Sequence, residues 1–435
     1  MTKLTFRPAH GLSVLTALLL PVLAAMTPAA LLAQEQQGSV VVLPVAPPVD
    51  PGAVPSAEQI DRILGQISTI TGLKLKHPVP MTALSKAEWR QWVEERLKES
   101  AKPEEIKVEE TAMKIFGFLP PDFDLRASTV DLMSEQAAAV YDHKKKRMIF
   151  VQGAAPDEMQ EAVLAHELSH ALADQHFDMG RFLEKGPHSD ESESARLAVV
   201  EGQAMWIMLE VMLNRNGQSL TKNSAALELM IPSMGKMAAS QYPVFEKSPL
   251  YLKESLLFPY SAGLLFQQAV IDKLGRDAFA AVLRDPPKTT QQVLHPAKYF
   301  AHAAAASVEL PEFDGRNKLK KLTEGDVGEF DMRVLFEQYA SKKEAVELAP
   351  EWRAGRFELL EDKAAKQPVL RWSVLWSSPE SARKALSLYL KVIEQKSQQL
   401  KWTRQSAEAA EGSNQLGGYR ILVDGSRLAA IEGLR

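Results

Sequence analysis

The sequence predicts an α+β fold that is predominantly helical, with a small hairpin near its middle and a small α+β domain at its end. Apolar residues recur at helical spacing over most of residues 56–298. Strand-like runs are found only near residues 137–151 and within residues 345–435. The chain has 435 residues, of which 46% are hydrophobic and 24% charged, so it can form two or three domains with a sizeable core.

The N-terminus is predicted to be a cleavable signal peptide over residues 1–33. Lys3 and Arg7 precede a short apolar run, and small residues lead to Ala33 before a polar stretch. The apolar run is shorter than a membrane-spanning helix requires. We therefore expect an exported protein, periplasmic or secreted, with no integral membrane span after cleavage. Residues 34–57 are rich in proline and small residues, which predicts a linker.

The amino-acid composition limits the kinds of metal site and binding partner that the chain can have. The chain contains no cysteine, so an exported form has no disulfide, and any metal site must be built from His, Asp and Glu. The net charge of −4 at pH 7 gives no indication of a nucleic acid or an anionic membrane as partner.

Residues 58–130 are predicted to form a helical N-terminal region. Helical periodicity covers residues 56–71, 85–99 and 103–116, and Ser85 with Glu88 has the spacing of a capping box. Residues 34–130 could also act as a propeptide. Beyond this region, the apolar runs Ala138–Tyr141 and Met148–Val151 flank a basic tip, which predicts a β-hairpin.

A helix predicted from about Pro156 to Asp174 carries the most informative motif of the chain. His166, Glu167 and His170 form an H-E-x-x-H sequence, and histidines four residues apart lie on one face of a helix. Two neutral imidazoles in this arrangement can bind one zinc ion, and the glutamate between them can accept a proton from water. The histidines share the inward-facing stripe of the helix, where unpaired polar groups are costly. The motif therefore predicts a zinc hydrolase.

A catalytic zinc site usually has three protein ligands, and the next predicted helix, residues 189–213, offers the third. Glu201 falls on its apolar stripe, where a carboxylate needs a strong partner. Gly202 beside it would let another backbone approach closely. Two packed helices, one with both histidines and one with a glutamate, form the gluzincin arrangement.

His176 is the second candidate, because it stands where the metzincin pattern H-E-x-x-H-x-x-G-x-x-H has its third histidine. Ala173 replaces the glycine of that pattern, and a side chain hinders the sharp turn made there. We favour Glu201, with His176 as the main alternative, followed by Asp174, Glu191 and Glu193.

The remaining chain divides into more helices and a separate small domain. Helical segments continue to about Lys298, and the prolines predict breaks at Pro232, Pro243, Pro249, Pro259 and Pro286-Pro287. The core domain is predicted over residues 131–340 and the C-terminal α+β domain over residues 345–435. In the latter, we expect a helix over 379–395 and strands over 357–360, 369–376, 400–404, 419–423 and 428–431.

Several segments resemble a largely uncharacterised bacterial family of gluzincin-like metallopeptidases. The central ones are AHELSHALADQHFD at residues 165–178 and ARLAVVEGQA at 195–204. Similar pieces are EQAAAVYDHKKKRMIFV at 135–151, FPYSAGLLF at 258–266 and PPKTTQQVLHP at 286–296. The resemblance implies a zincin fold in which the hairpin supplies the edge strand of a substrate cleft. Met205 departs from thermolysin-like members, which have at this position an aspartate that orients a zinc histidine.

These observations predict an exported zinc metallopeptidase that acts on a peptide or protein substrate. His166, His170 and Glu201 would hold one catalytic zinc, with Glu167 as general base. Tyr260 and His295, from the family-like segments, are candidates for stabilising the oxyanion of the transition state. The alternatives are a catalytically inactive zincin-fold protein that binds or scaffolds in the cell envelope, and a structural module whose histidines bind no metal.

Overall fold

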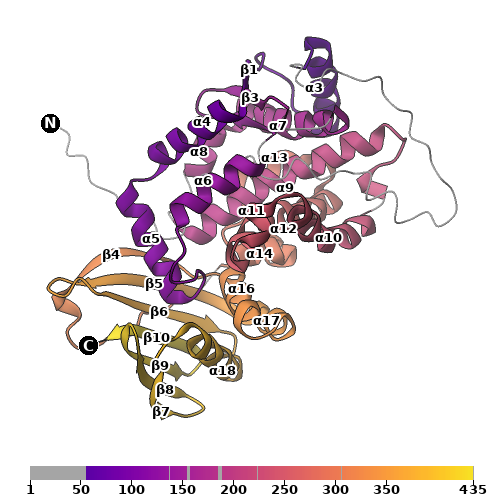
Figure 1. The fold of residues 1–435 in the computed structure, drawn as a ribbon. Helices are drawn as coiled ribbons and strands as arrows, with labels where there is room; N and C mark the ends of the chain where they lie inside the picture. Colours follow the sequence, from indigo (N-terminus) through magenta and orange to yellow (C-terminus); the bar gives the residue numbers. More distant parts are fainter. Residues whose placement is uncertain are drawn as a thin grey trace, which may run out of the picture.

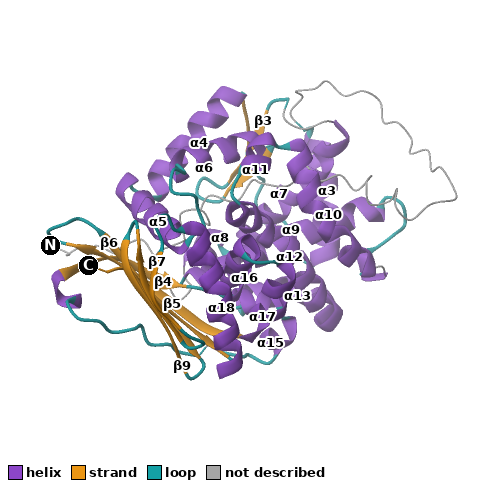
Figure 2. Cartoon of the chain, turned by 60° about the horizontal axis from the view of Figure 1, so that its bottom comes forward, coloured by secondary structure: helices purple, strands orange, loops and turns teal. Residues whose placement is uncertain are grey.

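The computed structural model describes residues 55–136, 138–153, 157–184, 189–222, 224–304 and 306–434. The predicted signal peptide, residues 1–33, and residues 34–54 of the predicted linker lie outside this part of the chain. The described chain is a mainly helical α+β protein with a three-stranded and a seven-stranded sheet. The seven-stranded sheet lies at one end of the molecule, and most helices lie beyond it (Figures 1 and 2). The predicted fold class is confirmed at this level.

The N-terminal region follows the predicted helices closely. Its helices are α3 (Ala57–Thr71), α4 (Lys86–Ser100), α5 (Pro103–Phe116) and α6 (Leu125–Gln136), of which only α6 was not predicted. The capping box before α4 is present, because the Ser85 N–H donates to Glu88 Oε2 at 2.7 Å and the Glu88 N–H donates to Ser85 Oγ at 3.3 Å.

The small sheet contains the predicted hairpin and one strand from the N-terminal region. Strands β2 (Ala139–Asp142) and β3 (Arg147–Val151) pair antiparallel, and β1 (Met81–Leu84) pairs parallel to β3. The strand order is β1-β3-β2, so β2 is an edge strand. Strand β1 belongs to this sheet and α3 packs against the helix of the H-E-x-x-H motif, so residues 57–84 of the N-terminal region contribute to the packing around the site.

Three long helices form the centre of the helical part. These are α7 (Asp157–Phe177), α9 (Asp190–Asn214) and α12 (Leu250–Leu274), and α9 packs against both of the others. Shorter helices surround them: α8 (Met179–Glu184), α10 (Ala225–Gln241), α11 (Pro243–Lys247), α13 (Ala278–Arg284), α14 (Thr290–Leu294) and α15 (Pro296–Phe300). Among the described residues, α9 is the one helix long and apolar enough to cross a membrane, and 83% of its most apolar window is buried inside the protein.

Two of the predicted proline breaks are wrong. Pro243 begins α11 and Pro249 caps α12, as expected, but Pro232 lies inside α10 and Pro259 inside α12. A proline costs a helix one hydrogen bond and a steric clash. Pro259 is buried, and its helix α12 packs closely against α9. We attribute the survival of the helix to this tertiary packing, which outweighs the local penalty.

The C-terminal sheet is antiparallel, with the strand order β4-β5-β6-β10-β9-β8-β7. Its strands are β4 (Leu319–Asp326), β5 (Trp352–Asp362), β6 (Pro368–Trp376), β7 (Lys401–Gln405), β8 (Ala409–Asn414), β9 (Gly417–Asp424) and β10 (Arg427–Leu434). The associated helices are α16 (Glu329–Tyr339), α17 (Lys342–Leu348) and α18 (Pro379–Lys396). Every predicted strand and the predicted helix of this region is present, whereas β4, β8, α16 and α17 were not predicted.

The sheet begins earlier in the sequence than the predicted C-terminal domain. Strand β4 lies within the range predicted as the core, yet it pairs with β5 along the outer edge of the sheet. Helix α5 also packs on this sheet, with the ring of Phe116 edge-on to that of Phe357 at 5.4 Å between centroids. One continuous apolar core therefore joins the helical part to the C-terminal sheet.

Candidate metal centre

Helix α7 brings the two histidines of the motif together on its buried face. His166 is 1% exposed and His170 is 5% exposed. Their Nε2 atoms lie 3.1 Å apart, with the rings nearly perpendicular at 84°. This is the consequence of the four-residue spacing, which stacks side chains on consecutive turns of a helix.

Helix α9 places Glu201 against both imidazoles. Glu201 Oε2 lies 3.1 Å from His166 Nε2 and 3.6 Å from His170 Nε2, and the carboxylate is fully buried. One donor atom from each of the three residues falls within 4.8 Å of the others, so the cluster could hold a metal ion. Two imidazoles and one carboxylate are a donor set typical of catalytic zinc.

Two buried polar atoms at this cluster have no hydrogen-bond partner among the described residues. They are Glu201 Oε1 and His166 Nδ1. A buried charge with an unused lone pair is costly unless a cation pairs with it. The unpartnered Glu201 oxygen therefore fits a metal ligand better than a purely structural ion pair. His166 Nδ1 also lacks an orienting carboxylate, which agrees with Met205 standing where thermolysin-like members have aspartate.

The electrostatics favour the metal-binding protonation state at His166 and Glu201, whereas at His170 burial is outweighed by Glu201 and the pKa is raised, so a bound metal would have to displace a proton there. Burial lowers the pKa of His166, so its imidazole is neutral near neutral pH. Burial alone would raise the pKa of Glu201, but the adjacent His170 and His166 outweigh it and lower that pKa. A neutral imidazole and an ionised carboxylate are the forms that bind metal.

Glu167 lies on the same helix and contacts the edge strand. It is 1% exposed, and its Oε2 accepts a hydrogen bond from the backbone N–H of Tyr141 in β2 at 2.7 Å. Burial raises the pKa of Glu167 to about 8. A carboxyl group with a pKa near neutrality suits proton transfer in both directions. The hairpin thus lies directly beside the motif helix, with β2 as its free edge.

Glycines set the distance between α9 and α12. A Cβ on Gly202 would lie 2.1 Å from the carbonyl carbon of Gly263, and a Cβ on Gly263 would lie 2.2 Å from the carbonyl oxygen of Ala198. Contacts this short exclude any side chain at the crossing. The close backbone approach predicted at Gly202 is therefore confirmed, immediately beside the candidate ligand Glu201.

This helix crossing brings Tyr260 to the metal cluster. Tyr260 is fully buried on α12, and its ring is stacked on that of His166, with centroids 6.2 Å apart and planes inclined by 27°. Of the two predicted transition-state residues, Tyr260 is the one that the structure places next to the candidate ligands.

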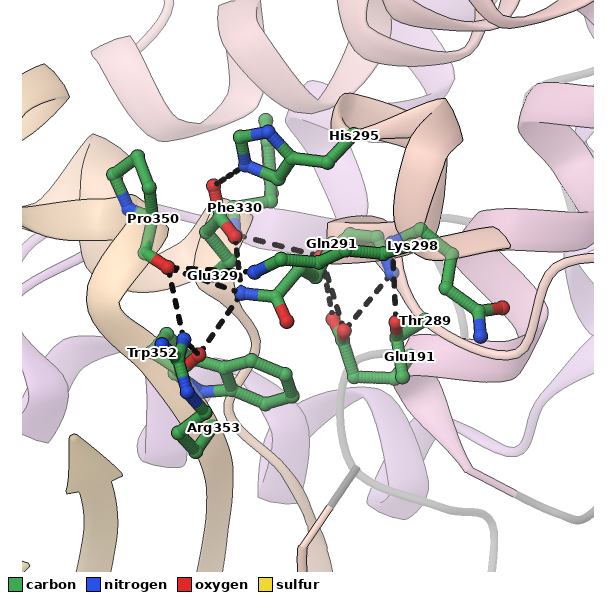
Figure 3. A network of polar contacts seen from close by, with 12 residues as sticks. Glu191, Thr289, Gln291, His295, Lys298, Glu329, Phe330, Pro350, Trp352 and Arg353 are labelled. Atoms are coloured by element: carbon green, nitrogen blue, oxygen red, sulfur yellow. Dashed lines mark hydrogen bonds and ion pairs between the residues drawn. The ribbon is translucent and has the colours of Figure 1, made fainter. Parts of the chain in front are cut away.

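His295 lies in a different cluster, which Figure 3 shows. His295 Nε2 is 2.7 Å from Glu329 Oε1, and Gln291 Nε2 donates to the other oxygen of Glu329 at 2.6 Å. Thr290 in the same segment donates to Glu191 at the start of α9. Glu191 precedes Glu201 by ten residues, or about 15 Å along the helix. The structure therefore does not bring His295 to the imidazole–carboxylate cluster.

The residues considered as alternative third ligands do not join the two histidines. His176 Nε2 is 2.7 Å from the carbonyl oxygen of Lys74, and Glu191 accepts hydrogen bonds from the Thr290 amide and hydroxyl. Asp174 is bound by donors from the hairpin. Glu193 lies eight residues before Glu201, about 12 Å along α9. Glu201 is the carboxylate that joins the two histidines.

Sequence reasoning considered Asp174 only as a possible metal ligand and missed its contact with Tyr141. Tyr141 Oη donates to Asp174 Oδ2 at 2.6 Å, which links the edge strand to the metal helix a second time. A signal for this contact was present, because Asp174 lies four residues after His170 and seven after Glu167, on the same face of the helix.

Comparison with known proteins adds no family assignment. No protein-family model, no curated protein and no solved structure matches the chain. The functional inference therefore rests on the residues and geometry of the site.

Proposed function

We propose that the protein is an exported zinc metallopeptidase of gluzincin type. The observation that carries the proposal is the buried cluster of His166, His170 and Glu201, with Glu167 on the same helix. Export is supported by the signal-peptide pattern of residues 1–33. The zincin-like nature of the core is supported by a metal helix, a glutamate helix and an adjacent edge strand.

His166, His170 and Glu201 would hold the zinc. When bound, zinc supplies Lewis-acid activation of water and of the scissile carbonyl. Glu167 would accept a proton from the attacking water and later deliver it to the leaving amine. The Tyr141 N–H, bonded to one oxygen of Glu167, would orient this carboxylate.

Tyr260 is the better-supported candidate for the second oxyanion donor. Its ring lies against His166, whereas His295 is paired with Glu329 in the cluster of Figure 3. A donor must lie within hydrogen-bond reach of the developing oxyanion to stabilise it. We therefore assign the transition-state role to Tyr260 and a structural role to His295.

The edge strand supports an extended peptide as the substrate. The Val151 N–H donates to the Ala138 carbonyl, so Ala138 and Val140 direct their backbone groups toward β3. By alternation, Ala139 and Tyr141 direct theirs away from β3; the Tyr141 N–H is taken by Glu167, which leaves the Ala139 N–H and C=O and the Tyr141 C=O to pair with an extended peptide added as a further strand. The Tyr141 end of this edge contacts Glu167, which would place the scissile bond there.

One observation favours a second function, a zincin-fold binding protein without catalysis. The three candidate ligands and Glu167 are each at most 5% exposed, and β2 is buried along its whole length. A substrate would reach the site only if the covering chain moved. Zinc binding without cleavage of casein or of a broad peptide library would support this alternative.

The variant Glu167→Gln tests the peptidase proposal. We expect it to keep its zinc and to lose hydrolysis by about 10²- to 10⁴-fold, because the general base is gone. Glu161→Gln is the matched control on the same helix, since Glu161 pairs with Arg62 and Arg215 and with none of the candidate ligands. Retained hydrolysis in Glu167→Gln would remove Glu167 from the mechanism, and a wild-type chain without zinc by elemental analysis would refute the metal site.

A further inference from the structure

Asp174 forms a buried junction between the hairpin and the metal helix. Its carboxylate is 5% exposed and accepts hydrogen bonds from Tyr141 Oη at 2.6 Å, Lys146 Nζ at 2.7 Å and the Met179 N–H at 2.7 Å. The Lys146 ammonium compensates the buried negative charge, and both carboxylate oxygens are occupied. We name Tyr141, Lys146 and Asp174 the hairpin clamp.

Tyr141 holds the edge strand to α7 at two points. Its backbone N–H donates to Glu167 and its phenol donates to Asp174. These two acidic residues are seven apart on one helix face, about 10 Å along the axis. Two anchors at this separation fix both the position and the direction of β2 relative to α7, which one hydrogen bond cannot do.

The turn of the hairpin places Lys146 beside Asp174. Asp142 Oδ1 accepts hydrogen bonds from the N–H groups of Lys144 and Lys145, and Arg96 pairs with the same oxygen at 3.2 Å. Lys146 itself adopts a left-handed conformation, with φ of 52°. An Asp side chain bonded to the following amides is a typical turn-forming device.

We propose that Asp174 and the Tyr141 phenol are positioning residues for the proposed hydrolysis, holding β2 so that the Tyr141 N–H orients the carboxylate of Glu167. The inference rests on the proposed function for its catalytic part. Among the described residues, neither side chain forms a hydrogen bond with a candidate metal ligand; both act through the strand and Glu167. A displaced strand would leave the metal bound and misdirect the base.

The chain provides a matched control for this clamp. Tyr251 Oη donates to Asp331 Oδ1 at 2.7 Å, and both residues are buried where α12 meets α16. This pair also joins a buried phenol to a carboxylate, although Asp331 accepts a second hydrogen bond from the Gly328 N–H rather than from a lysine, and it involves neither the hairpin nor Glu167. Tyr251→Phe and Asp331→Asn therefore report what the loss of a buried phenol–carboxylate bond does to stability alone.

The experiment measures zinc content, thermal unfolding, kcat and KM for Tyr141→Phe, Asp174→Asn and the two control variants of the full chain. We expect the clamp variants to keep stoichiometric zinc and to lose about 10- to 100-fold in kcat, with a smaller change in KM. The control variants should lose comparable thermal stability and keep kcat. Unchanged kcat in both clamp variants, or an equal loss in the controls, would overturn the positioning role.

Amide hydrogen exchange tests whether the hairpin clamp holds β2, independently of whether the protein is a peptidase. The amides of residues 139–142 should exchange faster in both clamp variants than in the wild type, and at the wild-type rate in Tyr251→Phe. Unchanged exchange in the clamp variants overturns the clamp, whatever the activity. A wild-type chain that cleaves nothing overturns the peptidase proposal and with it the catalytic part of the inference, while exchange still decides whether the clamp exists.

Discussion

The molecule contains two His–Glu contacts of similar length and different character. His166 Nε2 lies 3.1 Å from Glu201, and His295 Nε2 lies 2.7 Å from Glu329. Both oxygens of Glu329 have partners, because Gln291 occupies the second. Glu201 instead faces two imidazoles with one oxygen and has no described partner for the other. A His–Glu pair in which both carboxylate oxygens have partners is a structural contact. A buried pair in which one carboxylate oxygen has no described partner is suited to bind a cation.

The two pairs also differ in what surrounds them. The pair at Glu201 lies where α7, α9 and α12 meet, beside Glu167 and Tyr260. The pair at Glu329 joins the end of α14 to the start of α16, where Gln291 also donates to the Trp352 carbonyl at 2.9 Å. The sequence predicted a functional role for both histidines, and it could not separate the candidate ligand from the histidine in a structural contact.

The largest expected effect is on zinc affinity. Glu201→Gln should weaken zinc binding by more than about 100-fold, because losses at groups outside the ligand shell already reach that size. The matched variant Glu329→Gln should bind zinc like the wild type. Competition with a chromophoric chelator measures both affinities. Equal zinc affinities in the two variants would contradict the claim that Glu201, and not Glu329, is a zinc ligand.

The next effect concerns the helix crossing that positions the Glu201 pair. Gly202→Ala should destabilise the fold by about 1–3 kcal/mol or more, because the new methyl group meets the backbone of Gly263. Gly65→Ala is the control, since a Cβ there meets nothing within 4 Å in helix α3. It should be neutral or stabilising by up to about 1 kcal/mol. Denaturant unfolding compares the two, and equal stabilities would contradict the close approach.

Asp331, which lies two residues after Glu329 on α16 and accepts a hydrogen bond from Tyr251, should make the stability of the protein depend on pH. Burial raises the pKa of Asp331 from 3.8 to about 6. The folded protein therefore holds this proton more tightly than the unfolded chain does, so the stabilisation is complete below about pH 4 and is lost as the pH rises through about 6. The loss should be on the order of 1–3 kcal/mol. Urea unfolding measures the free energy of unfolding at several pH values in this range. That free energy should depend less on pH in Asp331→Asn than in the wild type, and an equal dependence on pH in both proteins would contradict this assignment.

The smallest effect is expected at His295. Its side chain is 32% exposed, so screening weakens its pairing with Glu329. His295→Gln should cost about 1 kcal/mol of stability and leave zinc affinity and kcat unchanged. Steady-state kinetics with a thermal unfolding control measures this. A large loss of kcat at unchanged stability would return His295 to the catalytic machinery.

Much of the fold was predictable where local signals are strong. Helix α5 has its predicted bounds, and its first residue, Pro103, is a typical helix start. Strand β4 was missed because LKKLTEGD is charged and lies on the sheet edge, where alternation is weak. Helix α6 was missed because LRASTVDLMSEQ shows no clear apolar stripe. Pro259 within α12 shows tertiary packing overriding a local signal.

The site was predictable to the extent that helix geometry alone determines it. The spacing of His166 and His170 fixes their juxtaposition, and an isolated carboxylate on an apolar helix face indicates a partner for Glu201. The partners of His295 and Asp174 depend on how separate elements dock, and one sequence does not contain that information. Tyr260 was suggested by resemblance, and the Gly202–Gly263 crossing is the physical reason for its position.

The most direct test of the metal centre is zinc K-edge X-ray absorption of the wild-type full chain, compared with Glu201→Gln. We predict one zinc per chain with two imidazole nitrogens and a carboxylate oxygen at about 2.0–2.2 Å, and loss of this signature in the variant. A spectrum without imidazole ligands, or one that is the same in both proteins, would contradict the assignment of His166, His170 and Glu201 as the zinc site.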